Sequence, residues 1–212
     1  MTHSLYRQGT RENLTGDFTM FAIPAVGINV KGSGPKKRKF LEIALRHNVV
    51  NIGGSNLGNL ATYTAEELLE RVPDGQAMQV CFNSKEDVIN VLRETIAADI
   101  GLSIVVQGIR EDVEDCFRTV GLKPHTVNHA LGVWGKTELL PDKQILEFTT
   151  MCGHALVSAN LTKRCIDDVL SGRKTPKEGA KILAAPCVCG IFNTARAEAL
   201  LARLLERAER AE

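Results

Sequence analysis

The sequence predicts an α/β protein, in which a small parallel or mixed sheet covered by helices is followed by an all-helical C-terminal subdomain. Short apolar runs alternate with segments of helical periodicity between about residues 36 and 133, a pattern typical of strands and helices in turn. After Pro141 the strand signals stop and only helical patterns remain. We therefore expect an α/β domain over residues 1–140 and a helical subdomain over residues 141–212.

The first 35 residues are expected to form an irregular lead-in, because Pro24 argues against a central strand within the apolar stretch 18–28. The clearer elements follow this lead-in. Apolar spacing and turn residues predict helices at 36–45, 64–71, 84–98 and 110–120 and strands at 49–52, 78–82, 102–106 and 126–133. This alternation is what favours a parallel or mixed sheet.

The C-terminal part gives four helix signals, at 143–150, 155–170, 175–185 and 194–212. Two capping boxes mark helix starts along the chain. Thr64 with Glu67, and Thr175 with Glu178, place a hydroxyl and a carboxylate where they satisfy the free amides at the start of a helix. Pro176 adds a residue that is favoured at the first helical position.

The composition is that of an ordinary soluble globular protein. Of the 212 residues 44% are apolar and 24% are charged, and the formal net charge is +1, so we expect no strong nucleic-acid or membrane signal. The start of the chain lacks a signal-peptide core, and no apolar run approaches the ~20 residues of a membrane helix. We expect a cytoplasmic protein whose six cysteines are reduced thiols.

Two short motifs carry the strongest functional signal, Cys-Gly-His at 152–154 and Cys-Val-Cys-Gly at 187–190. Both fall in expected breaks between helices. Gly153 and Gly190 permit the positive φ values that ligand loops often need. Backbone amides in such turns point at the sulfur atoms and stabilise thiolate charge. The motifs therefore suit an anionic sulfur site.

We expect a metal centre on Cys152, His154, Cys187 and Cys189. All four donors would complete a tetrahedral Zn²⁺ site, whereas the three thiolates alone would hold a [4Fe–4S] cluster and leave one iron free for a substrate. The spacing matches neither a zinc finger nor a ferredoxin run, and the room left for chemistry favours the cluster. Two alternatives stay open: the cysteines pack as small buried apolar residues, or they exchange a disulfide.

The other cysteines are expected to serve packing. Cys81 falls within an expected strand, and Cys116 and Cys165 fall on apolar faces of expected helices. Free cysteine is among the residue types most often buried in protein cores. None of the three is expected to be a ligand.

A candidate anion-binding site precedes the helix at 36–45. Gly32 and Gly34 could supply amide donors to a phosphate or carboxylate. Lys36 and Lys37 would lie in a first helical turn, where the helix dipole disfavours cations, and a bound anion would resolve this conflict. The Gly-Lys-Ser/Thr of a P-loop is missing, and a solvated basic turn is the alternative.

Three histidines are candidate catalytic residues. His154 lies beside the expected centre, and His125 and His129 lie at the end of the last expected strand, where each could act as an acid, a base or an extra ligand. A structural role is the alternative for each. Together with Asn51 they place a substrate between the helical subdomain and the strand ends, while Trp134 is expected to pack between the two parts.

The leading hypothesis is therefore a cytoplasmic iron–sulfur enzyme of lyase, hydratase or sulfur-transfer type that acts on a small anionic molecule. In it, three cysteines hold the cluster and His154 is a fourth ligand or proton shuttle. The alternatives are a non-catalytic metal or cluster carrier that serves a partner protein, a redox sensor, and a structural Cys3His zinc protein. The helical C-terminus could bury a face in a homodimer, although packing within one chain explains it equally well.

Overall fold

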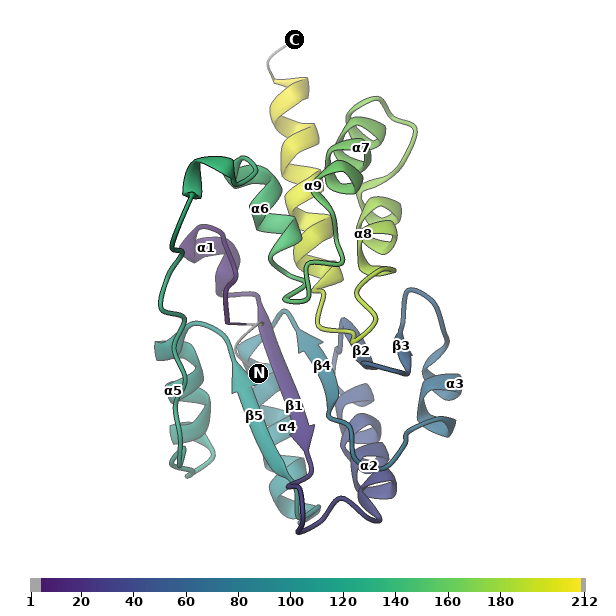
Figure 1. Cartoon of the computed structure of the whole chain (residues 1–212), viewed down its shortest axis with the longest axis vertical. Helices are drawn as coiled ribbons and strands as arrows, with labels where there is room; N and C mark the ends of the chain where they lie inside the picture. The colour runs from purple at the N-terminus through teal and green to yellow at the C-terminus, as the bar shows by residue number, and fades with distance from the viewer. Residues whose placement is uncertain (1–4, 211–212) are drawn as a thin grey trace.

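The computed structural model of the chain describes residues 5–210 (Figure 1). The strands are β1 (Phe18–Ile23), β2 (Asn51–Gly54), β3 (Gly58–Asn59), β4 (Met78–Phe82) and β5 (Ser103–Gln107). The helices that accompany them are α1 (Arg11–Leu14), α2 (Ser33–Leu45), α3 (Ala65–Glu70), α4 (Lys85–Ala97) and α5 (Arg110–Thr119). A 3-10 turn, η1 (Thr137–Leu139), leads to the C-terminal helices α6 (Lys143–Thr149), α7 (Ala159–Leu170), α8 (Pro176–Ala184) and α9 (Thr194–Glu209).

The five strands form one sheet in the order β3-β2-β4-β1-β5, and every neighbouring pair is antiparallel. The expectation of an α/β fold is confirmed, but the expectation of a parallel or mixed sheet is wrong. The connection β1–α2–β2 skips β4, and β4–α4–β5 skips β1, as in a split βαβ unit. The strand in each skipped position, β4 or β1, runs antiparallel to the strands on both of its sides. The alternation of strand and helix in the sequence is the same for both arrangements, so it cannot distinguish them.

The strand β1 lies inside the sheet, between β4 and β5, in the stretch that the sequence predicts to be irregular. Pro24 follows directly after Ile23, the last residue of the strand, so no ladder hydrogen bond needs its missing amide. The expected strand at 126–133 does not form, and residues 155–158 are a turn before α7 instead of its first helical turn. Both capping boxes form as expected.

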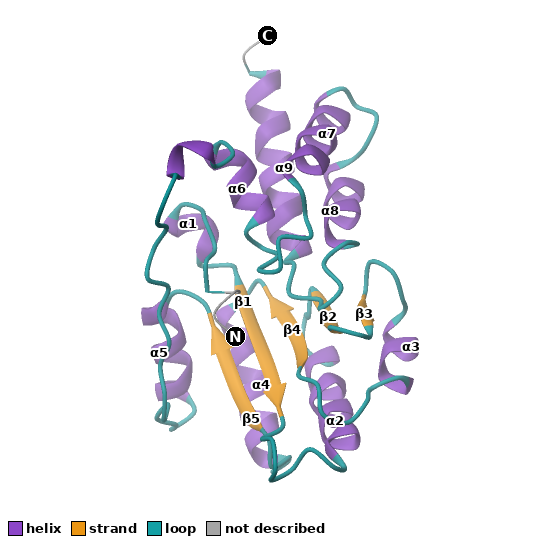
Figure 2. Cartoon of the chain, in the orientation of Figure 1, coloured by secondary structure: helices purple, strands orange, loops and turns teal. Residues whose placement is uncertain are grey.

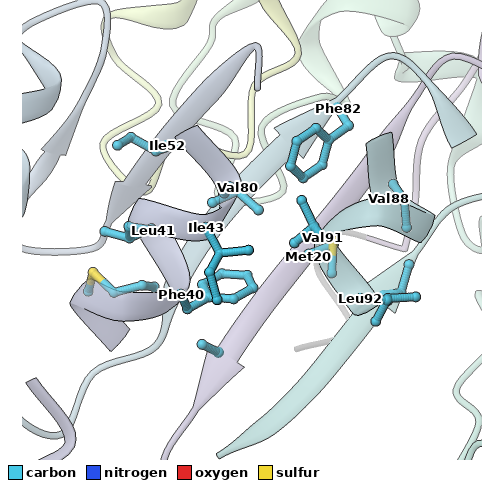
Figure 3. Close-up of a cluster of buried hydrophobic side chains, with 14 of the residues drawn as sticks. Met20, Phe40, Leu41, Ile43, Ile52, Val80, Phe82, Val88, Val91 and Leu92 are labelled. Atoms are coloured by element: carbon cyan, nitrogen blue, oxygen red, sulfur yellow. The ribbon is translucent and has the colours of Figure 1, made fainter. Parts of the chain in front are cut away.

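One face of the sheet packs against α2 and α4. Figure 3 shows Met20 of β1 and Val80 and Phe82 of β4 beside Phe40 of α2 and Val91 of α4, and all five are fully buried. These strand residues occupy alternate positions, which point to the same face of a strand. Packing in this core fixes α2 and α4, the helices of the two crossover connections, against the sheet.

A second core joins the sheet to the all-helical C-terminal region, which lies at one end of the sheet (Figure 2). Phe21 and Cys81 point to the face opposite Met20, and they pack with Phe148 of α6 and Leu201 of α9. The sulfur-bearing loops lie within this second core. Among the described residues, no helix combines the length and the apolar character that a membrane crossing requires.

Candidate metal centre

The two cysteine motifs come together in the structure, although His154 of one and Cys189 of the other are 35 residues apart in sequence. Cys152 lies in the turn after α6, and Cys187 and Cys189 lie in the loop between α8 and α9. The Sγ atoms of Cys187 and Cys189 are 4.0 Å apart, and Sγ of Cys189 is 3.6 Å from Nδ1 of His154. Cys152 contacts Cys187 through a hydrogen bond between their sulfur atoms. Each cysteine is at most 2% exposed, whereas His154 is exposed.

The Cys-Val-Cys-Gly loop lies directly on the backbone of β2. Gly190 has φ 77°, and a Cβ atom there would come within 2.5 Å of the carbonyl carbon of Ile52. On the strand side, a Cβ atom on Gly53 would come within 3.0 Å of the backbone of Cys189. Two glycines that face each other thus allow a contact that side chains would prevent. This explains the glycine at position 53, directly after Ile52.

Three amide side chains of the sheet hold the carbonyl oxygens of this loop. Asn59 Nδ2 donates to the carbonyl of Cys187 at 2.7 Å, and Asn51 Nδ2 donates to that of Phe192 at 3.0 Å. Gln79, with its amide oriented to donate, lies 2.7 Å from the carbonyl of Cys189. All three side chains are buried. Because the carbonyls face the sheet, the loop can direct its amides toward the sulfurs.

Backbone amides surround the sulfur of Cys152. The N–H groups of His154, Leu156 and Val157 all donate to it. The turn that makes this possible has its positive φ at Ala155, at 56°, and not at Gly153 as the sequence predicts. The expectation for Gly190 is confirmed. A sulfur that accepts three amide hydrogen bonds is well suited to carry negative charge.

The three thiols have strongly different affinities for protons. Donation from Cys187, together with backbone amides, lowers the pKa of Cys152 to about 6, against the opposing effect of burial. The same donor and the amide of Ile191 lower the pKa of Cys189 to about 6. The pKa of Cys187 is raised, because its proton serves the two neighbouring sulfurs and burial disfavours another charge. Of the three sulfurs, Cys152 and Cys189 therefore carry negative charge most readily, and Cys187 keeps its proton longest.

The four donors follow one another in a row, from Cys152 through Cys187 and Cys189 to His154. Within residues 5–210, no three His, Cys, Asp or Glu side chains already form a complete ion-binding group. The neighbouring separations of 4.0 and 3.6 Å are nevertheless near a tetrahedral edge. Zn–S bonds of about 2.3 Å imply about 3.8 Å between sulfurs. A coordination site would form if the four donor side chains turned toward one common point.

The candidate histidines at 125 and 129 are not brought to this cluster. His125 and His129 are exposed and belong to the segment between α5 and η1, which runs along the side of the molecule away from β2 and β3 (Figure 1). Trp134, in the same segment, is 83% exposed, so the expectation that it packs between the two parts is wrong. Of the residues expected around a substrate, His154 lies beside the sulfur of Cys189, and Asn51 contacts the same loop at the carbonyl of Phe192.

At the start of α2, the expected anion donors already serve an internal carboxylate. The amides of Gly32 and Gly34 donate to Asp74 at 2.8 and 2.6 Å. These two hydrogen bonds are the leading causes of the lowered pKa of Asp74. Lys37 is buried and donates to the carbonyls of Pro73 and Gln76. An external anion at Gly32 and Gly34 would have to displace Asp74. Of the two lysines, Lys36 is exposed and Lys37 is buried.

Sequence reasoning missed the residues that support the cysteine loop. Asn59, Gln79 and Arg7 each donate to its carbonyls, and no motif marks them. The only available signal was the run of glycines after Asn51, which resembles any loop at the end of a strand. Two cavities of about 200 and 350 Å³ lie elsewhere, and neither is lined by a cysteine or by His154.

Comparison of the chain with protein-family models, with curated proteins and with solved structures finds no match. The chemistry of the site therefore rests on its own geometry.

Proposed function

We propose that this protein holds a metal centre on Cys152, Cys187 and Cys189, with His154 as the fourth donor. The observation that carries the proposal is the gathering of these four donors from two distant turns, with Sγ of Cys189 at 4.0 Å from Sγ of Cys187 and at 3.6 Å from Nδ1 of His154. Three sulfurs and one imidazole are a common donor set for zinc. We propose Zn²⁺ as the ion, because these separations fit the edges of a single tetrahedral site.

The surroundings favour a closed centre that holds its metal tightly. Structural zinc sites use four protein donors, whereas catalytic sites keep a position for water or substrate. Here the three cysteines are almost fully buried, and neither cavity described above reaches them. A metal at this place would connect the turns after α6 and α8 and fix both of them against β2. The proposed role of the ion is thus to hold the C-terminal region on the sheet.

A second candidate is the [4Fe–4S] enzyme of lyase, hydratase or sulfur-transfer type. One observation favours it: His154 is the one exposed member of the four, at the end of the row. If the imidazole moves aside, the three thiolates could hold a cluster whose fourth iron faces a small anionic substrate. A carrier or redox sensor would use the same donors without the substrate.

Metal analysis tests the proposal directly. The protein is purified without oxygen, and zinc, iron, sulfide and the visible spectrum are measured for wild type, Cys187→Ser and Cys165→Ser. Cys165 is a matched control, because it is also a buried thiol that donates to a carbonyl within the same core. We expect about one zinc per chain in wild type and in Cys165→Ser, and its loss in Cys187→Ser.

Two other outcomes are informative. A brown wild-type protein with about four irons and sulfide would replace zinc by the cluster. A wild-type protein that is fully folded and free of metal, and that binds neither Zn²⁺ nor Co²⁺ when these are added, would overturn the metal centre altogether.

A further inference from the structure

The peptide unit between Gly190 and Ile191 connects Cys189 to a cysteine that lies outside the four donors. Its carbonyl oxygen accepts a hydrogen bond from Sγ of Cys81 at 3.4 Å. Its N–H group donates to Sγ of Cys189. A donor at the oxygen of a peptide group polarises the group and strengthens donation by its N–H. Cys81 therefore acts on Cys189 through one peptide.

Behind Cys81 lies the buried guanidinium of Arg7. It donates a hydrogen bond to the sulfur of Cys81, and its Nη2 also donates to the carbonyl of Ile191 at 2.6 Å. Asp17 fixes its other side, at 2.5 Å from Nη1. The Arg7 side chain is 8% exposed and Cys81 is fully buried, so little solvent screens these contacts.

Cys81 keeps its proton in this position. Burial raises the pKa of its thiol well above the usual range, although Arg7 opposes the shift. A protonated Cys81 can donate to the carbonyl of Gly190 while it accepts from Arg7. The three hydrogen bonds thus run in one direction, from the cation of Arg7 to the sulfur of Cys189.

We infer that Arg7 and Cys81 form a chain of donors that stabilises the negative charge of Cys189 in the metal centre. This inference rests on the proposed function. Both are positioning residues, because they act on the metal through a ligand and do not touch it. Partners of this kind hold ligands in place and tune their electron donation.

Four variants test the inference, Cys81→Ala, Cys81→Ser, Cys165→Ala and Cys165→Ser. Cys165 is an unusually close match, because its thiol also donates to a glycine carbonyl, that of Gly179, at 3.4 Å. Two properties are measured on the full chain: the Zn²⁺ dissociation constant, by competition with a chelator, and the thiolate-to-Co²⁺ charge-transfer band. Stability is measured alongside them, because both alanine variants remove one buried hydrogen bond.

We expect Cys81→Ala to weaken Zn²⁺ binding about tenfold, because Cys189 is then held less firmly in its ligand position. The Co²⁺ band should move to lower energy, because a thiolate that accepts a weaker hydrogen bond donates electrons more readily. Cys81→Ser keeps a donor and should stay closer to wild type in both properties. Both Cys165 variants should bind as wild type does, even where stability falls.

Equal affinities and equal bands for Cys81→Ala and Cys165→Ala would overturn the inference while leaving the metal centre intact. A wild type that binds no metal would overturn the proposed function first, and the inference with it. The two failures are therefore distinguishable in one experiment.

Discussion

At the scale of single residues, the central feature is the unequal sharing of protons among three buried sulfurs. Cys152 and Cys189 have pKa values lowered to about 6, whereas Cys187 retains its proton. The stabilising groups are local amides and the neighbouring thiol, so the folded chain by itself favours negative charge on these two sulfurs. A metal ion that bound here would meet two sulfurs that release their protons readily, and metal affinity depends on that release.

This arrangement predicts how the metal-free protein responds to pH. In the unfolded chain Cys152 has an ordinary thiol pKa, 9.0, and in the folded chain about 6. The folded thiolate therefore adds stability that is complete above about pH 9 and is lost as the pH falls through about 6. We expect the free energy of unfolding to decrease between pH 9 and pH 6, measured by urea denaturation with reductant and chelator present. Cys152→Ser should show a shallower decrease, and equal slopes would contradict the assignment.

At the scale of elements, the contact of the Cys-Val-Cys-Gly loop with β2 decides where the sulfurs lie. Gly190 combines a positive φ of 77° with a close approach to the backbone of Ile52, so two separate costs would fall on any side chain. Asn51 and Asn59, from β2 and β3, fasten the same loop by its carbonyls. The short strands at this edge of the sheet thus support the loop that carries Cys187 and Cys189.

Alanine substitutions separate these two costs. Gly190→Ala should destabilise the protein by more than about 3 kcal/mol, because a left-handed non-glycine residue costs of order 1–3 kcal/mol and the clash with β2 adds to it. Gly172 is the matched control, since its φ is 71° and a Cβ atom added there would meet no other atom within 4 Å. Gly172→Ala should cost about 1–2 kcal/mol, the cost of the left-handed conformation alone. Equal costs in urea denaturation would show that the contact with β2 is loose.

At the scale of the whole molecule, a buried charge cluster joins the N-terminal segment to β1 and α9. Asp17 is fully buried and lies 2.5 Å from Arg7 and 2.7 Å from Arg196, whose side chain is 2% exposed. Asn193, the N-cap of α9, also donates to Asp17 at 3.0 Å. Asp17 therefore holds both the N-terminal segment, through Arg7, and the start of α9, through Asn193 and Arg196, close to the sulfur loop.

Removal of the central carboxylate should be severe. Asp17→Asn leaves two buried guanidinium groups without their common partner, and breaking a buried pair typically costs about 3–5 kcal/mol. The matched control is Glu111→Gln in the surface pair with Arg11, where both side chains are about two-thirds exposed. This change should cost less than about 1 kcal/mol. The measurement is the midpoint of thermal or urea unfolding, and similar losses in the two variants would show that the cluster contributes little.

The molecule also shows how far the sequence alone could lead. Local signals, which depend on residues within one turn or one strand, predicted the helices well: the capping boxes at Thr64 and Thr175 form, and β4 has the predicted bounds. Pairing between strands involves residues far apart in sequence. No local signal therefore distinguished an antiparallel split βαβ arrangement from a parallel sheet, and β1 was missed because Pro24 lies just beyond it.

The candidate site divides in the same way. The sequence by itself determined which donors the chain carries and that two glycine-marked turns present them, since residue type and turn chemistry are local properties. Only the tertiary structure decided that Cys152 meets Cys187, that His154 joins them, and that His125 and His129 do not. It also gave Cys81 a place behind Cys189. The physical reason is that these contacts depend on how α6, α8 and α9 pack on the sheet, which is a property of the whole core and not of any one segment.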